Sequence, residues 1–340
     1  YRVLQCVSGE GQNTVFEGLV IRNGFAPLTD YFSDGTLYRV GGGVLIRNSS
    51  PVLSNCMLQN NRSYLGYGGG LFAGSANGGT SEPAFINCTF TDNSAEISGG
   101  GLFNYFSSTT FTNCIFTNNA AQYGGGMYNH DSSSPTLTNC TFTSNSTGDG
   151  GGGMLNNSSS PTLTNCTFTG NSAYDDGGGM VNYEYSSPTL TDCTFTGNSA
   201  ADDGGGMLNT NDGNPTMTGC TFTSNSAITS GGGMYNSGSS SPRLNGCNFC
   251  GNTSGTGNRN VAGDAIDGSS SDNLLLLNCN EGDVNFDLAI NSGDLGYLLA
   301  LWGASSVLNA DINQDGVVNG ADLAYILGYF GGTCDSTTAP

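Results

Sequence analysis

The sequence contains no lysine and few charged residues of any kind. Its 340 residues include seven arginines and 27 acidic residues, which gives a formal net charge of −20 at pH 7. Nucleic acids and anionic membranes repel such a chain, so both are poor candidates for partners. An acidic surface suits divalent cations and solubility better.

Long apolar runs and helix-forming segments are also scarce. The apolar run within NLLLLN (273–278) is far shorter than the roughly 20 residues of a membrane span. Ala, Leu, Glu and Lys, which favour helices, are sparse before the last sixty residues. The single histidine, His130, lies on a Ser-rich segment and is predicted to be a surface residue rather than a catalytic base.

Glycine, by contrast, is abundant, and it marks an internal repeat. Segments of Gly-Gly-Gly followed by an aliphatic residue begin at residues 41, 68, 99, 124, 151, 177, 204 and 231. Each copy continues with a Ser/Pro stretch, a cysteine and Phe-x-x-Asn, except that Leu58 replaces the first phenylalanine. The repeated cysteines are Cys56, Cys88, Cys114, Cys140, Cys166, Cys193, Cys220 and Cys247.

Within one copy the side chains alternate with a period of two, which is typical of strands. In SSPTLTNCTFTGNSA (159–173), Leu163 lies on one strand, and Cys166 and Phe168 lie on the next. The alternation shifts at Thr164-Asn165, which predicts a corner. With the Gly-Gly-Gly segment, each copy predicts three short strands and three corners, which form one coil of a parallel β-solenoid.

Stacked coils would place equivalent residues in columns about 4.8 Å apart. The Cys, Phe and Leu columns are predicted to fill the interior, with the thiols acting as small buried apolar groups. A charged residue at Cys166 should then disrupt the stack. A further column can hydrogen-bond amide to amide. Its members are Asn104, Asn129, Asn156, Asn182, Asn209 and Asn236.

The GGGM and FTGN (Phe168–Asn171) motifs resemble those of right-handed parallel β-helix proteins. More narrowly, they are similar to the GGA[I/V/L] and FxxN repeats of polymorphic outer-membrane proteins and related bacterial surface proteins, with Gly in place of Ala. The resemblance covers about residues 15–255. It implies an all-β, right-handed parallel β-helix of about 8–9 coils at 1–255 and an exported bacterial protein. The Gly/Ser/Asn-rich composition that follows predicts a cap and linker at 256–280.

A second repeat, with a 28-residue period, occupies the C-terminal part of the chain. It places oxygen donors at the spacing of a calcium loop, with positions 1, 3, 5, 7, 9 and 12 as ligands. The first loop offers Asp283, Asn285, Asp287, the carbonyl of Ala289, Asn291 and Asp294. The second offers Asp311, Asn313, Asp315, the carbonyl of Val317, Asn319 and Asp322. Gly316 provides the sharp turn of the second loop, whereas Leu288 replaces it in the first.

Each loop is followed by an apolar stripe at helical spacing, which begins at Leu295 and Leu323 respectively. These loop–helix pairs resemble a type I dockerin over about 281–332, and a domain is assigned to 281–335. The resemblance implies two calcium ions and a cohesin partner, bound near loop positions 10 and 11. Those positions hold Ser292-Gly293 and Gly320-Ala321, and no basic residue follows. We therefore expect docking onto another extracellular protein or a neighbouring copy.

Two further groups of residues are candidate sites. Five aspartates precede Gly-Gly-Gly on three successive coils and should cluster: Asp149, Asp175, Asp176, Asp202 and Asp203. They are interpreted as a solvated acidic corner, with a weak cation site and a catalytic site as alternatives. In the segment 25–39, Tyr31, Phe32 and Tyr38 could contact a glycan or a protein partner, or could cover the end of the core.

Cys250, Cys279 and Cys334 lie outside the repeated column. A Cys279–Cys334 disulfide would join the ends of the C-terminal domain, and this pairing is slightly favoured over Cys250–Cys279. Cys6 remains unassigned.

The favoured hypothesis is a non-enzymatic extracellular or cell-surface protein with a structural or adhesive role. Its rigid β-helix would carry a calcium-stabilised module for attachment or self-assembly, for example as a head-to-tail fibre subunit. No arginine lies near the acidic corner, and no nucleophile constellation is visible. The alternatives are a polysaccharide lyase or hydrolase anchored by the dockerin-like tail, and a non-catalytic glycan-binding surface protein.

Overall fold

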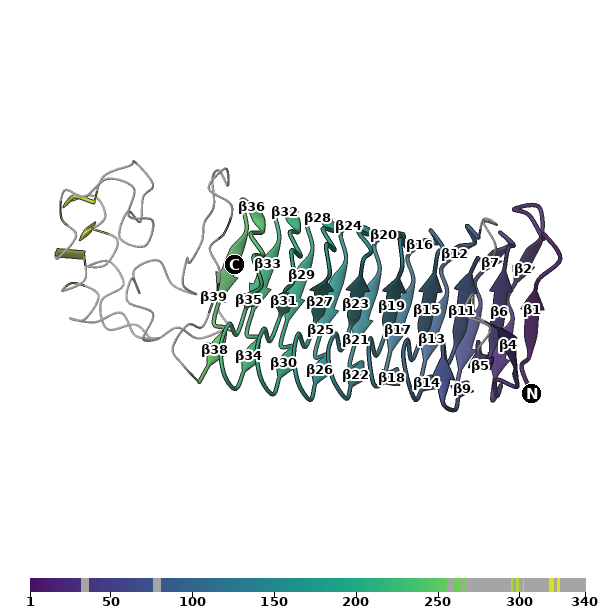
Figure 1. The fold of residues 1–340 in the computed structure, drawn as a ribbon. Helices are drawn as coiled ribbons and strands as arrows, with labels where there is room; N and C mark the ends of the chain where they lie inside the picture. Colours follow the sequence, from purple (N-terminus) through teal and green to yellow (C-terminus); the bar gives the residue numbers. More distant parts are fainter. Residues whose placement is uncertain are drawn as a thin grey trace.

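The computed structural model describes residues 1–31, 37–75, 81–255 and 260–263, together with residues 266, 295, 298–299, 302, 318–320 and 323–324. The described residues form 39 short strands. All but three of them wind around one axis, and the coils follow one another from β1 near the N-terminus to β39 (Figure 1). Four parallel sheets run along this axis. The predicted parallel β-helix is therefore confirmed.

The ten-stranded sheet contains the strand that follows each Gly-Gly-Gly segment. Its strands are, in order, β1 (Leu4–Cys6), β6 (Val44–Arg47), β11 (Leu71–Gly74), β15 (Leu102–Tyr105), β19 (Met127–His130), β23 (Met154–Asn157), β27 (Met180–Tyr183), β31 (Met207–Asn209), β35 (Met234–Asn236) and β39 (Val261–Gly263). Each strand pairs in register with the next, so that Asn156 lies opposite Asn182. The last strand, β39, lies beyond residue 255.

Two nine-stranded sheets contain the alternating segments found in the sequence. The Thr-Leu-Thr sheet consists of β2 (Val15–Glu17), β7 (Val52–Ser54), β12 (Ala84–Ile86), β16 (Thr110–Thr112), β20 (Thr136–Thr138), β24 (Thr162–Thr164), β28 (Thr189–Thr191), β32 (Thr216–Thr218) and β36 (Arg243–Asn245). The Thr-Phe-Thr sheet consists of β3 (Val20–Arg22), β8 (Met57–Gln59), β13 (Thr89–Thr91), β17 (Ile115–Thr117), β21 (Thr141–Thr143), β25 (Thr167–Thr169), β29 (Thr194–Thr196), β33 (Thr221–Thr223) and β37 (Asn248–Cys250).

The prediction of three strands in each coil is wrong, because a fourth, eight-stranded sheet is present. Its strands are β9 (Arg62–Ser63), β14 (Ser94–Ala95), β18 (Ala120–Ala121), β22 (Ser146–Thr147), β26 (Ser172–Ala173), β30 (Ser199–Ala200), β34 (Ser226–Ala227) and β38 (Thr253–Ser254). Two residues are too short a segment to show alternation, which explains why the pattern in the sequence missed it.

The corners use residues that tolerate a left-handed backbone. Asn165, where the alternation shifts, has a φ of 52° and separates β24 from β25. Gly151 opens the Gly-Gly-Gly corner with a φ of 73°. The next glycine, Gly152, has a different reason: a Cβ there would lie 2.4 Å from the carbonyl oxygen of Gly178 in the following coil. Glycine thus permits both the turn and the close approach of successive coils.

Identical side chains stack along the interior as predicted. The Phe142 and Phe168 rings lie 4.7 Å apart and are inclined by 3°, and the pairs on either side are similar. The eight cysteines of the repeat are buried free thiols. Together with the Met and Leu columns they form one continuous core. Cys6 is also buried and free, and it pairs with Ile46 in the ten-stranded sheet rather than joining the cysteine column.

Buried asparagines form two hydrogen-bonded ladders. The predicted one runs along the ten-stranded sheet, where the Asn156 amide donates to Asn182 Oδ1 at 2.9 Å. The second uses the asparagine of Phe-x-x-Asn and was not predicted. In it, Asn171 donates to Asn198 Oδ1 and to the Phe142 carbonyl, both at 2.9 Å, and accepts from the backbone and side chain of Asn145.

A short hairpin projects from the first coils. It consists of β4 (Leu28–Tyr31) and β5 (Leu37–Val40), which pair antiparallel, and of β10 (Gly66–Tyr67), which pairs parallel with β5. Of the C-terminal residues described, Leu295, Leu298, Leu299, Gly320, Leu323 and Ala324 are helical.

We predict that Asn171→Ala destabilises the β-helix by about 4 kcal/mol. The substitution leaves the buried backbone N–H of Asn145 without its acceptor and removes three further buried hydrogen bonds, to the Asn145 side chain, Asn198 and Phe142. An unsatisfied group costs about 1–3 kcal/mol and a lost hydrogen bond about 1 kcal/mol. Urea unfolding followed by circular dichroism would measure the change. Thr162→Ala, at an exposed strand position of the same coil, is the matched control. An equal effect of the two substitutions would contradict the role given to the ladder.

Cys166→Asp should be more damaging than Cys166→Ala. A carboxylate in this column is desolvated and has no cation to pair with, at a cost of about 3 kcal/mol or more, whereas alanine only leaves a small void. The comparison is made on soluble yield and on the midpoint of thermal unfolding. If the two variants have equal midpoints, the column is not the dry interior inferred from its burial.

Candidate functional site

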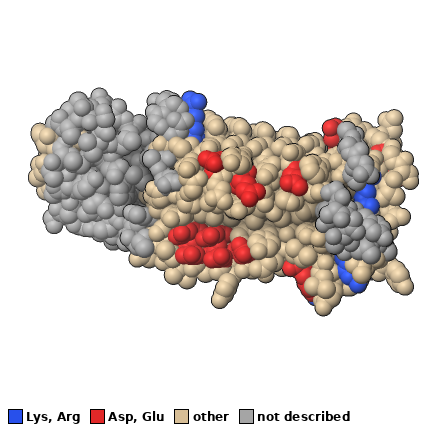
Figure 2. All heavy atoms as spheres, viewed as in Figure 1, with Lys and Arg blue, Asp and Glu red and all other residues tan. Residues whose placement is uncertain are grey.

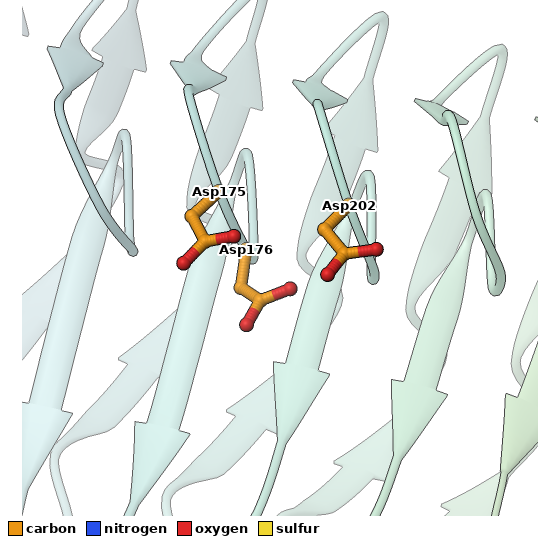
Figure 3. Close-up of side chains that lie close together, drawn as sticks. All are labelled: Asp175, Asp176 and Asp202. Carbon is orange, nitrogen blue, oxygen red and sulfur yellow. The ribbon is translucent and has the colours of Figure 1, made fainter.

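Three of the five predicted acidic side chains form a compact cluster on the surface of the β-helix. Asp175 and Asp176 come from the corner that precedes β27, and Asp202 comes from the corner that precedes β31 (Figure 3). One ligand atom from each lies within 4.8 Å of the others. Hydrogen bonds extend the arrangement, since the Asp203 amide donates to Asp176 Oδ1 at 3.0 Å and Asp203 Oδ1 accepts from Ser230 at 2.8 Å.

Burial makes three carboxyl groups of this corner, those of Asp176, Asp203 and Asp149, harder to ionise. Burial raises the pKa of Asp176 to about 6, and the nearby charges of Asp175, Asp202 and Asp203 act in the same direction. Burial also raises the pKa of Asp203 and of Asp149. The charge of Asp149 in turn raises the pKa of the Tyr123 hydroxyl. Figure 2 shows the acidic side chains gathered on this face and the basic ones toward its ends, and the sequence has no Arg or Lys between residues 63 and 242.

A groove of about 430 Å³ lies beside this cluster, on the outer face of the ten-stranded sheet. Asp149 and Asp176 line it together with Tyr123, Tyr128 and Tyr183. This groove was not predicted from the sequence. Its lining comes from outward-facing positions, which differ from coil to coil and therefore carry no repeat signal.

His130 is more enclosed than the sequence predicted. Its side chain is 32% exposed and lies 3.6 Å from the Asp131 carboxylate, and the Tyr105 and Tyr128 rings pack nearby. Its Nδ1 is buried without a hydrogen-bond partner. Burial lowers the pKa of the imidazole, although the charges of Asp131 and Glu184 oppose this shift. His130 is therefore mostly neutral at pH 7.

The aromatic residues of segment 25–39 are only partly described. Tyr38 packs edge-to-face against Tyr67, with ring centroids 5.3 Å apart, beside a cluster that contains Val40 and Leu45. The side chain of Tyr31, and Phe32 as a whole, lie outside the described residues. For Tyr38, the observed contact is packing against the β-helix.

The predicted calcium ligands lie outside the described residues, except for Asn319, which is partly buried. Of the first apolar stripe, Leu298 is fully buried, whereas Leu299 and Trp302 are about half exposed. The donors that the sequence offers in each loop are all oxygen atoms, which is the chemistry that calcium requires. The residues present therefore fit this ion.

The favoured disulfide is wrong. Cys250 is disulfide-bonded, and every other described cysteine is a free thiol, so its partner lies outside the described residues. Only Cys279 and Cys334 then remain in the sequence, and the Cys279–Cys334 pairing would need both of them. The alternative, Cys250–Cys279, remains a prediction.

We predict that Asp176→Asn stabilises the protein at pH 7.5 but not at pH 4. The folded pKa lies above the unfolded value, so the carboxylate destabilises the folded state once the pH rises through that interval. The amide keeps the Oδ1 acceptor and removes the charge. After allowance for solvent screening, the gain is about 1 kcal/mol, or roughly 2 °C in the unfolding midpoint.

Differential scanning calorimetry in EDTA measures this change without a divalent cation to screen the carboxylates. Asp92→Asn removes the same charge from an exposed corner of another coil and is the matched control. A gain for Asp176→Asn that is the same at both pH values would contradict the assigned ionisation.

Comparisons with known proteins agree with this architecture. Residues 77–253 and 154–291 match the family described as "Right handed beta helix region", and residues 281–330 match "Dockerin type I domain". Searches of curated proteins and of solved structures found no significant match. Among the described residues, no helix is long and apolar enough to cross a membrane. The chain belongs to the right-handed β-helix family and carries a type I dockerin domain after its β-helix.

Proposed function

We propose that this protein is a non-enzymatic extracellular scaffold, in which the β-helix is a rigid body and the dockerin domain attaches it to another protein. The observation that carries this proposal is that a dockerin domain follows a β-helix whose described strands pair in register from coil to coil. Dockerin domains generally bind calcium and cohesin partner proteins. We therefore place this protein outside the cell, where the dockerin domain would attach it to a partner protein.

The described part of the β-helix supports a structural role. Its coils repeat the same interior side chains, with the stacked phenylalanines and both asparagine ladders running through successive coils. In-register pairing of this kind gives stiffness along the axis, because every coil is hydrogen-bonded to both neighbours. A stiff rod holds whatever it displays at a defined distance from its attachment point.

The sequence of the dockerin domain indicates how attachment would differ from that of other dockerins. Residues 281–340 contain no basic residue, and small residues occupy loop positions 10 and 11 of both copies. A partner that binds basic side chains of a dockerin domain would have none to contact in this domain. We propose a calcium-dependent contact with an extracellular protein, either a cohesin that accepts Ser292-Gly293 and Gly320-Ala321 or a second copy of this chain.

We predict that the double substitution Asp311→Ala, Asp315→Ala releases calcium from the second loop and abolishes attachment. Losing two of the six ligands should weaken calcium binding by tenfold or more, and the loop loses its shape without the ion. Metal analysis of the full chain measures bound calcium. Binding to an immobilised type I cohesin measures attachment to a cohesin, and sedimentation velocity measures attachment to a second copy of the chain. Asp335→Ala, outside both loops, is the matched control.

EDTA should have the same effect as the double substitution, and added calcium should restore the wild type only. Attachment that survives EDTA would overturn the calcium-dependent contact. Release of unsaturated uronides or of reducing sugars by the purified chain would overturn the non-enzymatic proposal instead, whatever the result with cohesin.

A further inference from the structure

The corners that join the eight-stranded sheet to the Gly-Gly-Gly segments stack into one row along the β-helix, which we call the corner edge. It consists of residues 64–67, 96–98, 122–123, 148–150, 174–176, 201–203 and 228–230. Backbone hydrogen bonds link neighbouring corners, since the Tyr123 amide donates to the Ile97 carbonyl at 2.9 Å. The Asp202 amide donates in the same way to the Asp175 carbonyl. Successive corners are therefore about 4.8 Å apart, like strands in a sheet.

Large apolar side chains are exposed along the corner edge. Leu65 is 59% exposed and Tyr174 is 81% exposed, and Tyr123 lies between them in the row. Leu65 also has a φ of 49°, a left-handed conformation that residues other than glycine rarely adopt. Its amide donates to the Glu96 carboxylate at 3.3 Å, which holds this turn in place. A row of exposed apolar side chains is typical of a surface that contacts another protein.

The charge of the corner edge changes along the β-helix. Arg62 precedes the first of these corners, and its side chain is 54% exposed. Its guanidinium lies 3.0 Å from the Glu96 carboxylate and has five N–H donors, so it can bond a second carboxylate as well. Four corners further along, the carboxyl groups of Asp175 and Asp176 project from the edge (Figure 3). The sequence has no Arg or Lys between residues 63 and 242 to balance them.

We propose that two copies of this chain dock antiparallel through their corner edges. Tyr123 lies two corners from Leu65 and two corners from Tyr174. A two-fold axis through Tyr123 therefore brings the Leu65 corner of each copy onto the Tyr174 corner of the other. The same axis places Arg62 opposite the partner's Asp175. Such a contact is self-complementary, because every pairing occurs twice.

Further pairs on the corner edge agree with this register. Arg39 lies one coil before the first corner, since β5 pairs with β10, and the axis places it opposite the partner's Asp202. Glu96 then faces the partner's Asp149, and Arg62 beside Glu96 offsets this like-charged pair. A parallel arrangement would instead set Arg62 against its own copy and the aspartates against theirs. The charges therefore favour the antiparallel arrangement.

The size of the contact sets its strength. The matched corners, from Arg39 to Asp202, extend over about 29 Å of each rod. Because the edge is narrow, the interface lies at the low end of the range for specific protein contacts, and we expect a dissociation constant on the order of 10 µM. The contact uses only the β-helix, so it goes beyond the calcium-dependent attachment proposed for the dockerin domain.

Sedimentation equilibrium of the full chain in EDTA tests the proposal. EDTA removes the calcium on which the dockerin contact is proposed to depend, so failure of one proposal can be told from failure of the other. Salt at about 0.15 M screens the general repulsion between two acidic chains beyond about 8 Å, whereas the paired groups lie within that distance. We expect a monomer–dimer equilibrium. A chain that stays monomeric at about ten times the expected dissociation constant overturns the proposal.

Charge reversal then locates the contact. Arg62→Glu and Asp175→Arg should each weaken the dimer at least tenfold, and the double variant should restore it, because the two-fold axis pairs these positions of opposite copies. Asp175→Arg discriminates well, since it lowers the net negative charge of the chain and would by itself favour association. If one single variant fails to fold, as judged by circular dichroism, the other decides.

Arg243→Glu and Asp92→Arg make the same charge changes at exposed positions away from the corner edge, and they are the matched controls. Neither should change the dissociation constant. The proposal is overturned if the folded double variant stays monomeric, if the controls weaken the dimer as much as the variants on the edge, or if no charge reversal affects it.

Discussion

In-register parallel pairing is the constraint on which the rest of this structure depends. Each strand lies beside the equivalent strand of the next coil, so an interior side chain contacts its equivalents in the coils before and after it, and in long stretches of the columns these are the same residue. Only groups that pack well against themselves can be repeated in this way. Flat rings stack, as Phe142 and Phe168 do, and amides such as Asn156 both donate and accept.

The same constraint disfavours repeated charge. A column of carboxylates or ammonium groups would place like charges about 4.8 Å apart along the whole rod, and each would repel its neighbours. The scarcity of charged residues is therefore a consequence of the architecture. The acidic corner shows the effect locally, because burial and the neighbouring charges of Asp175, Asp202 and Asp203 together raise the pKa of Asp176.

The interior could be predicted from the sequence because it repeats, and much of the surface could not. Cys166 and Phe168 recur in register, so their columns were evident without a structure. The ladder of Asn171 escaped notice although the Phe-x-x-Asn motif contains it, because the sequence does not show which asparagines face inward. The acidic corner was predictable from adjacent coils, but the groove was not, since Leu155, Val181 and Leu208 follow no strict repeat.

This contrast separates two kinds of position within each coil. Inward positions must suit their own copies, so they hold the fold and carry little information about a partner. Outward positions such as Tyr123, Asp149 and Tyr183 meet solvent and can differ between coils at little cost to folding. Specific recognition by a repeat protein of this kind therefore has to arise where the repeat is broken on the outside. The groove on the ten-stranded sheet is such a place, because differing outward residues enclose a defined space over an unchanging core.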